Sequence, residues 1–145
     1  MGKRINLSEV DPQAYEAMIG LEEYLAQSGL DKSLYELIKT RASQINKCAF
    51  CINMHTRDAL ALGEASQRLF LLDAWRETNL YTEKERAVLA LPEAITLLPN
   101  GDVPDDVYQD ATKCLAPQEL AAVIMAIVTI NGWNRIAITT RMSLD

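Results

Sequence analysis

The sequence predicts a single all-α domain that covers residues 1–145. Signals for the start and end of helices recur along the whole chain, and no convincing run of alternating apolar and polar residues indicates a strand. No linker, low-complexity tract or internal repeat divides the chain, and its 145 residues suit one compact domain. These observations favour one helical core with no second domain.

Three helices are expected in the first half of the chain. Asp11-Pro12 is typical of a helix start, and Gly29 of a helix end. The segment Ser33-Leu34-Tyr35-Glu36 matches a capping box, so the second helix is expected to begin there. A third helix is expected from about Cys48 to Gly63, because apolar residues again recur at helical spacing.

The second half of the chain continues the helical pattern. We expect one helix over residues 66–77 and another that opens with the capping box Thr82–Glu85. Pro92 should kink or restart that helix, because proline removes a backbone donor and crowds the preceding turn. A turn at residues 100–102 and a short helix after Pro104 follow. Pro117 then begins a long apolar helix.

Charge and composition exclude several classes of partner. The net charge of −6 leaves no basic face for nucleic acid or for an anionic membrane surface. The N-terminal residues lack the apolar stretch of a signal peptide, and the run Leu120–Ile130 is shorter than the roughly 20 residues that span a bilayer. Three cysteines without an export signal favour the reducing cytosol. We therefore expect a cytoplasmic protein with no nucleic-acid or membrane partner.

The segment Cys48-Ala49-Phe50-Cys51-Ile52-Asn53-Met54-His55 carries the most distinctive chemistry. On a helix, Cys48, Cys51 and His55 share one face, and two cysteines at i and i+3 can form a disulfide. The positive end of the helix dipole favours a thiolate there, and His55 could act as a base for Cys51. A thiolate beside a second thiol can reduce a hydroperoxide, passing through a sulfenic acid to a disulfide.

Other interpretations of this segment stay open. Buried cysteines can be simple core residues, and His55 can be a satisfied core histidine. Zinc could use Cys48, Cys51 and His55 with Cys114 as a fourth ligand, although structural zinc sites usually draw two ligand pairs from separate turns. A thioredoxin-type pair would need a βαβ setting, which the chain does not offer.

The spacing Glu36…Cys48-x-x-Cys51-x-x-x-His55 resembles the alkyl hydroperoxidase D (AhpD)-like branch of the carboxymuconolactone decarboxylase superfamily. The similarity extends over most of the chain, and its further segments are residues 41–46, 73–77, 119–122 and 126–135. It implies an all-helical, homo-oligomeric thiol peroxidase that needs no bound metal or other cofactor. Because the founding decarboxylase branch lacks the cysteine pair, decarboxylation is disfavoured here.

The resemblance also implies a role for each site residue. Cys51 would be the peroxidatic thiol and Cys48 the resolving thiol, while His55 and Glu36 would form a proton relay. The substrates would be an alkyl hydroperoxide or hydrogen peroxide and a dithiol electron donor, either a protein or a lipoyl-type carrier. Some members carry a histidine between the two cysteines; this chain has Phe50 there, which could lower peroxidase activity or change the reductant.

Two functional alternatives and several structural expectations remain. The chain could be a redox-sensing or disulfide-handling protein without efficient peroxide turnover, or a zinc-stabilised interaction module. Glu36 could simply cap its helix at position N3 of the capping box. Phe50 and Met54 are expected to face away from the cysteines, towards another helix or a subunit. Polar residues of the last helix need partners, which a neighbouring subunit could supply: Asn131, Asn134 and Arg135.

Overall fold

The computed structural model describes residues 4–144 and confirms the all-α fold. Within these residues the chain forms helices and connecting turns without strands. In chain order the elements are α1 (Leu7–Val10), α2 (Pro12–Gln27), α3 (Lys32–Asn46), α4 (Ala49–Ala61), α5 (Ser66–Phe70), η1 (Leu72–Glu77), α6 (Glu83–Thr96), η2 (Leu98–Asn100), α7 (Asp105–Cys114) and α8 (Pro117–Thr140).

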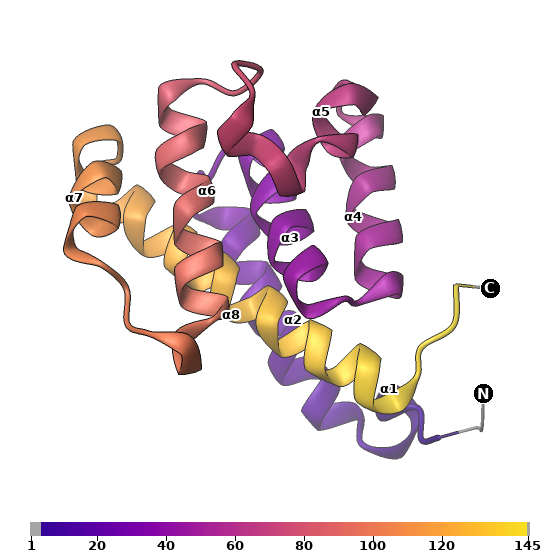
Figure 1. The fold of residues 1–145 in the computed structure, drawn as a ribbon. Helices are drawn as coiled ribbons and strands as arrows, with labels where there is room; N and C mark the ends of the chain where they lie inside the picture. The colour runs from indigo at the N-terminus through magenta and orange to yellow at the C-terminus, as the bar shows by residue number, and fades with distance from the viewer. Residues whose placement is uncertain (1–3, 145) are drawn as a thin grey trace.

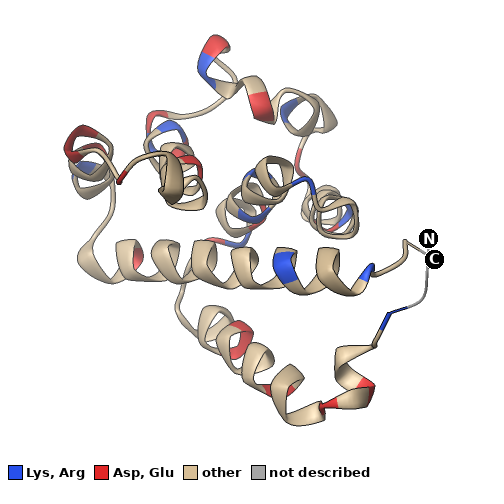
Figure 2. Cartoon of the chain, turned by 60° about the horizontal axis from the view of Figure 1, so that its bottom comes forward, with Lys and Arg blue, Asp and Glu red and all other residues tan. Residues whose placement is uncertain are grey.

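Helix α3 lies at the centre of the fold and packs against α4, α6 and α8 (Figure 1). The long helix α8 crosses the molecule, with α3, α4 and α6 on one side and α2 on the other (Figure 2). Apolar side chains of α3, α6 and α8 form the largest core cluster, in which Ile38, Val88 and Ile127 are fully buried. The same packing holds α2, α4 and the end of α8 around a shared space, and the candidate site lies there.

Polar side chains join α3 to α8 inside the chain. The amide of Asn46 donates to the side-chain oxygens of Asn131 at 2.9 Å and Asn134 at 2.8 Å. Asn134 in turn donates to the hydroxyl of Ser43 at 3.0 Å, and Arg135 donates to the backbone oxygen of Asn131 at 3.1 Å. The expectation that a neighbouring subunit supplies these partners is therefore wrong, because α3 pairs with Asn131 and Asn134, and Arg135 bonds to Asn131 of its own helix.

Helix α3 starts two residues earlier than the capping-box pattern predicted. Its N-cap is Asp31, whose carboxylate accepts the backbone N–H of Leu34 at 2.9 Å, and Ser33 lies inside the helix. Aspartate is as good an N-cap as serine, so the earlier residue takes the role. Glu36 is therefore not at position N3, and the capping explanation for this glutamate is wrong.

Only Lys47 and Cys48 separate α3 from α4. Lys47 adopts a left-handed conformation with φ 58°, and the Cys48 N–H reaches back to the Ser43 carbonyl at 3.0 Å, which closes the end of α3. Cys48 is then the N-cap of α4, and its sulfur accepts the Cys51 N–H at 3.3 Å. The predicted position of the cysteine pair at the start of a core helix is confirmed.

The helix predicted over residues 66–77 is divided in two, and the restart predicted at Pro92 does not occur. Residues 66–77 form α5 and then the 3-10 helix η1, because the α-helix ends at Leu71 with φ −100° and ψ 7°. Ala74, inside η1, also leaves helical geometry at φ −117° and ψ 26°. Helix α6 continues through Pro92 without restarting. Its neighbours Leu89 and Leu91 are buried in the core, so tertiary packing outweighs the lost backbone hydrogen bond.

Helix α8 is the one helix of the described chain that is long and apolar enough to cross a membrane by length and composition. It has 24 residues, so the shorter run noticed in the sequence underestimates it. In the structure it packs against α2, α3 and α6 and supplies core residues such as Val123 and Ile127. The core helix of a globular domain can have the same length and apolar composition, and these contacts favour a core helix over a membrane span.

Candidate functional site

Cys48 and Cys51 are joined by a disulfide whose Cα atoms lie 5.3 Å apart. Both cysteines are almost fully buried, with exposed fractions of 1% and 2%. The tight α3–α4 connection fixes their separation, because Cys48 caps the helix whose first turn contains Cys51. Apolar residues of α3, α4 and α8 surround the pair: Ala42, Phe50, Ile130, Trp133 and Ala137.

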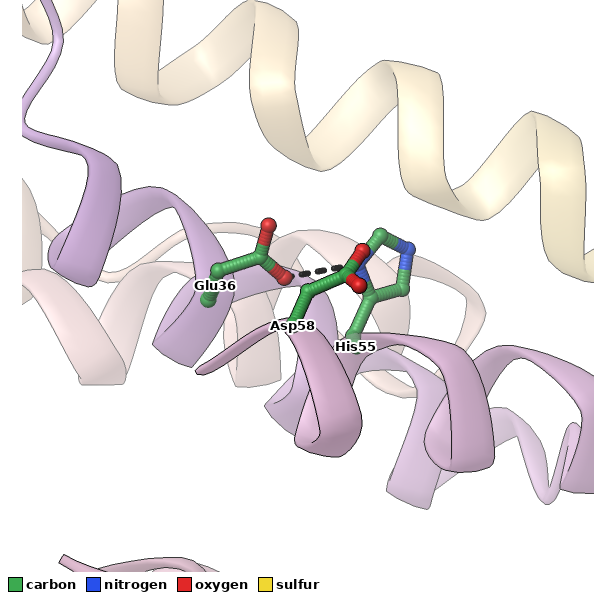
Figure 3. Close-up of side chains that lie close together, drawn as sticks. All are labelled: Glu36, His55 and Asp58. Carbon is green, nitrogen blue, oxygen red and sulfur yellow. Dashed lines mark hydrogen bonds and ion pairs between the residues drawn. The ribbon is translucent and has the colours of Figure 1, made fainter. Parts of the chain in front are cut away.

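Glu36 and His55 form a buried pair next to the disulfide. The Nδ1 atom of His55, on α4, lies 2.8 Å from a carboxylate oxygen of Glu36, on α3 (Figure 3). Both residues are more than nine-tenths buried, so little water competes for this contact. A carboxylate in this position accepts a hydrogen bond from the Nδ1–H group. The Nε2 atom of a neutral imidazole is then free to accept a proton.

The second ring nitrogen of His55 has no hydrogen-bond partner among the described residues, although it is buried. Figure 3 shows Glu36 and Asp58 on one side of the imidazole and this nitrogen pointing away from them. Buried polar atoms without a partner are rare in folded proteins and cost free energy. Nε2 is therefore a ready acceptor for a proton of a nearby group, as a catalytic base requires.

Asp58 is a third ionisable residue at this position, and the sequence analysis missed it. It lies one turn beyond His55 on α4, and its ligand atoms approach those of Glu36 and His55 within 4.8 Å. Unlike the other two, its side chain is exposed. The i, i+3 spacing of His55 and Asp58 on one helix face was the signal available in the sequence. Such a trio could hold a cation, but Glu36 already occupies the Nδ1 atom of His55 through a hydrogen bond.

A cavity of about 310 Å³ connects these groups. Cys51, His55 and Glu36 all line it, whereas Cys48 does not. Phe50 and Met54 line it too, which corrects the expectation that they face away from the cysteines. The cavity is enclosed by α2 and α8 as well as α4, so more than one face of α4 borders it. The remaining lining residues are Tyr15, Ile19, Glu22, Tyr35, Asp58, Trp133, Ala137 and Met142.

A second polar network borders the cavity and was also missed from sequence. The ammonium of Lys39, a fully buried side chain, contacts the Glu22 carboxylate, which also accepts hydrogen bonds from Tyr35 and from the Trp133 indole. Burial alone would raise the pKa of the Glu22 carboxyl, but the charge and hydrogen bond of Lys39, together with the hydrogen bonds from Tyr35 and Trp133, hold that pKa below its usual range. Burial and the neighbouring Glu22 raise the pKa of Tyr35, which stays protonated. The network therefore presents a fixed, charge-balanced wall to the cavity.

Cys114 does not join the other cysteines. It is a free, half-buried thiol at the end of α7. Its cavity is a different one, bordered by Trp75, Arg86 and Val107, and shares no residue with the cavity of Cys51. The four-ligand zinc site considered from sequence is therefore not assembled.

Residues 12–94, from α2 to α6, match the carboxymuconolactone decarboxylase family. The chain belongs to this family. The matched region contains Glu36, both cysteines of the pair, His55 and Asp58. The family relationship inferred from the sequence motif is thus confirmed over more than half of the chain.

One relative matches nearly the whole chain, and another matches half of it. The uncharacterised protein YdfG of Bacillus subtilis is 41% identical over 95% of this chain and 94% of its own length. The uncharacterised protein YnjA of Escherichia coli is 27% identical over 50% of this chain and 40% of its own length.

Solved structures share the fold. A protein of unknown function from Agrobacterium tumefaciens, provisionally named as the antioxidant defence protein AhpD, superimposes with a TM-score of 0.96 at 38% identity and covers 99% of each chain. A peroxidase-related protein from Silicibacter has a TM-score of 0.80 at 20% identity over 92% of this chain and 71% of its own, and this shows a common fold alone. The family and the cysteine pair at disulfide distance are compatible with a redox role.

Proposed function

We propose that this family member is a thiol peroxidase that reduces alkyl hydroperoxides or hydrogen peroxide through the Cys48–Cys51 disulfide. The observation that carries the proposal is the shared cavity, in which Cys51 meets the buried His55–Glu36 pair with its free Nε2 atom. A buried thiol beside a base, open to a small cavity, is the arrangement that thiolate chemistry requires.

The reaction starts from the reduced pair. His55 accepts the proton of the Cys51 thiol, directly or through a water, and Glu36 stabilises the imidazolium that forms. The thiolate attacks one oxygen of the hydroperoxide, the O–O bond breaks, and the leaving alkoxide takes a proton to become an alcohol. Cys51 is then a sulfenic acid. The Cys48 thiol displaces its hydroxyl as water and forms the disulfide.

The lining of the cavity supports the assignment of Cys51 to the peroxide. Cys51 borders the cavity, whereas Cys48 lies behind it as the N-cap of α4. The N-terminal turn of α4 also places its positive dipole end beside the thiolate. Cys48, at 5.3 Å between Cα atoms, is close enough to resolve the sulfenic acid without a large backbone movement.

The decisive experiment measures peroxide consumption by the purified chain with a series of dithiol donors, including a protein dithiol and a lipoyl compound. We expect turnover with at least one donor, and peptide mapping after mild peroxide should find the Cys48–Cys51 disulfide with Cys114 still reduced. If stoichiometric peroxide oxidises the pair but no donor supports turnover, the redox-sensing alternative replaces the peroxidase. A reduced chain that does not react with peroxide at all contradicts both.

The proposed enzyme is a homo-oligomer. Large apolar side chains remain exposed on several helices, among them Leu60 at 49%, Phe70 at 77% and Val128 at 46%. Burial of such side chains between subunits stabilises an assembly. Light scattering during size-exclusion chromatography should therefore report a multiple of the 16.2 kDa chain mass. A monomer at micromolar concentration would contradict this prediction.

A further inference from the structure

The cavity that holds Cys51 carries an unbalanced negative charge. Three carboxylates line it, from Glu22, Glu36 and Asp58, and no lysine or arginine of the described chain does. Lys39 lies behind the wall and pairs with Glu22, and His55 pairs with Glu36. The Asp58 carboxylate has no such partner, since no described residue forms a hydrogen bond or ion pair with this side chain.

Asp58 also lies where a ligand would approach. It is exposed, whereas Glu36 and His55 are buried. It borders both the cavity of Cys51 and a second one of about 630 Å³ between α2, α3 and α4. The two cavities share four lining residues: Glu22, Tyr35, Glu36 and Asp58. Among the described residues, Lys32, the first residue of α3, is the one cationic side chain that lines the second cavity. Asp58 therefore borders a ligand that fills either cavity.

The buried, unpartnered Nε2 atom belongs to His55, which lines the same cavity, and it marks this cavity as a ligand site independently of the carboxylates. A ligand that reaches this atom or Cys51 occupies a cavity that Asp58 also lines, so its charge acts on the Asp58 carboxylate. Two like charges about 6 Å apart change a rate constant by about threefold in a watery medium and by up to about a hundredfold at a lower effective dielectric constant. Because Asp58 is exposed, screening by salt and water favours the lower part of this range.

We infer that Asp58 is a specificity-determining residue that rejects negatively charged ligands, so the reductant of this site is a dithiol that carries no carboxylate. The inference rests on the proposed function, because it concerns the reductant of the Cys48–Cys51 disulfide. Asp58 does not take part in proton transfer in this scheme. It sets which dithiol can approach.

The reductive step balances without a further reactant. One thiolate of the dithiol attacks a sulfur of the Cys48–Cys51 disulfide, whose S–S bond breaks to leave a cysteine thiolate and a mixed disulfide. The second thiolate of the donor attacks the mixed disulfide and releases the other cysteine. Two electrons pass from the donor, which becomes a cyclic disulfide, to the two cysteines. The attacking group is already an anion, so an extra carboxylate on the donor adds to the repulsion.

The test compares two reductants that differ mainly in charge, dihydrolipoamide and dihydrolipoate. The oxidised full-length chain is mixed with each at low ionic strength and without peroxide, and tryptophan fluorescence, backed by thiol titration, gives the rate constant for opening the disulfide. We expect the wild-type chain to prefer the amide, and Asp58→Asn to reduce the amide-to-acid rate ratio by about three- to tenfold. Added salt should reduce the wild-type ratio in the same direction.

Asp102→Asn is the matched control, because it removes the same charge from an exposed turn between η2 and α7 and should leave the ratio unchanged. An effect of Asp58→Asn on the basicity of His55 alters both rates together and cancels in the ratio. An unchanged ratio in Asp58→Asn, or a disulfide that neither dithiol opens, overturns the inference. If the chain shows no peroxide turnover but its amide-to-acid rate ratio still depends on Asp58, only the peroxidase proposal is refuted. Failure of the proposed function and failure of this inference are therefore distinguishable.

Discussion

Replacement of Cys51 by serine is expected to abolish peroxide reduction, and replacement of Cys48 is expected to stop it after one turnover. The cavity reaches Cys51 but not Cys48, so the first oxidation should occur on Cys51. In Cys48→Ser the Cys51 sulfenic acid has no resolving thiol and should accumulate. In Cys51→Ser the remaining thiol lies behind the cavity, and no sulfenic acid should form at position 48.

Mass spectrometry after trapping of sulfenic acids measures these outcomes directly, alongside the rate of peroxide loss. Cys114→Ser is the control, because this thiol borders a different cavity and should leave turnover intact. If Cys48→Ser rather than Cys51→Ser prevents the first oxidation, the two cysteines have the opposite roles. If both variants consume peroxide at the wild-type rate, the pair is not the reactive centre.

The residues that sequence analysis placed correctly are those whose spacing carries information by itself. Cys48, Cys51 and His55 follow each other within two turns of one helix, so a local pattern is enough to place them on one face. Glu36 comes from another helix, and the family resemblance rather than the local pattern suggested its role. The local pattern suggested a helix cap, and the structure shows why that failed, because Asp31 had already capped the helix.

The residues that sequence analysis missed act through tertiary contacts. The buried Lys39 ammonium is tolerable only because Glu22, from another helix, meets it, and no spacing rule connects positions that far apart. Phe50 and Met54 were assigned to the wrong surroundings for the same reason: a helical wheel gives the face of a side chain but not which neighbouring helix encloses it. The role proposed for Asp58 rests on a carboxylate without a partner among the described residues, which sequence cannot show.

The His55–Glu36 pair gives the second large expected effect. His55→Ala should lower the rate of Cys51 oxidation near neutral pH by about 10²–10⁴-fold, the usual contribution of a positioned base. The pKa of the reactive thiol should move towards about 8.5, so the lost rate should return as the pH is raised. Stopped-flow oxidation of the reduced chain between pH 5 and pH 10 measures both the rate and its pH profile. Thermal unfolding shows whether the variant is folded.

Glu36→Gln should lower the same rate less, by about tenfold, because the amide oxygen can still accept the Nδ1 proton but carries no charge to stabilise the imidazolium. Glu23→Gln, on the exposed side of α2, is the matched control and should react at the wild-type rate. The double variant Glu36→Gln/His55→Ala then separates a relay from two independent effects. In a relay Glu36 acts through His55, so the double variant should be no slower than His55→Ala. Additive losses would mean that Glu36 assists Cys51 by another route, and a wild-type rate in His55→Ala would exclude the imidazole as the base.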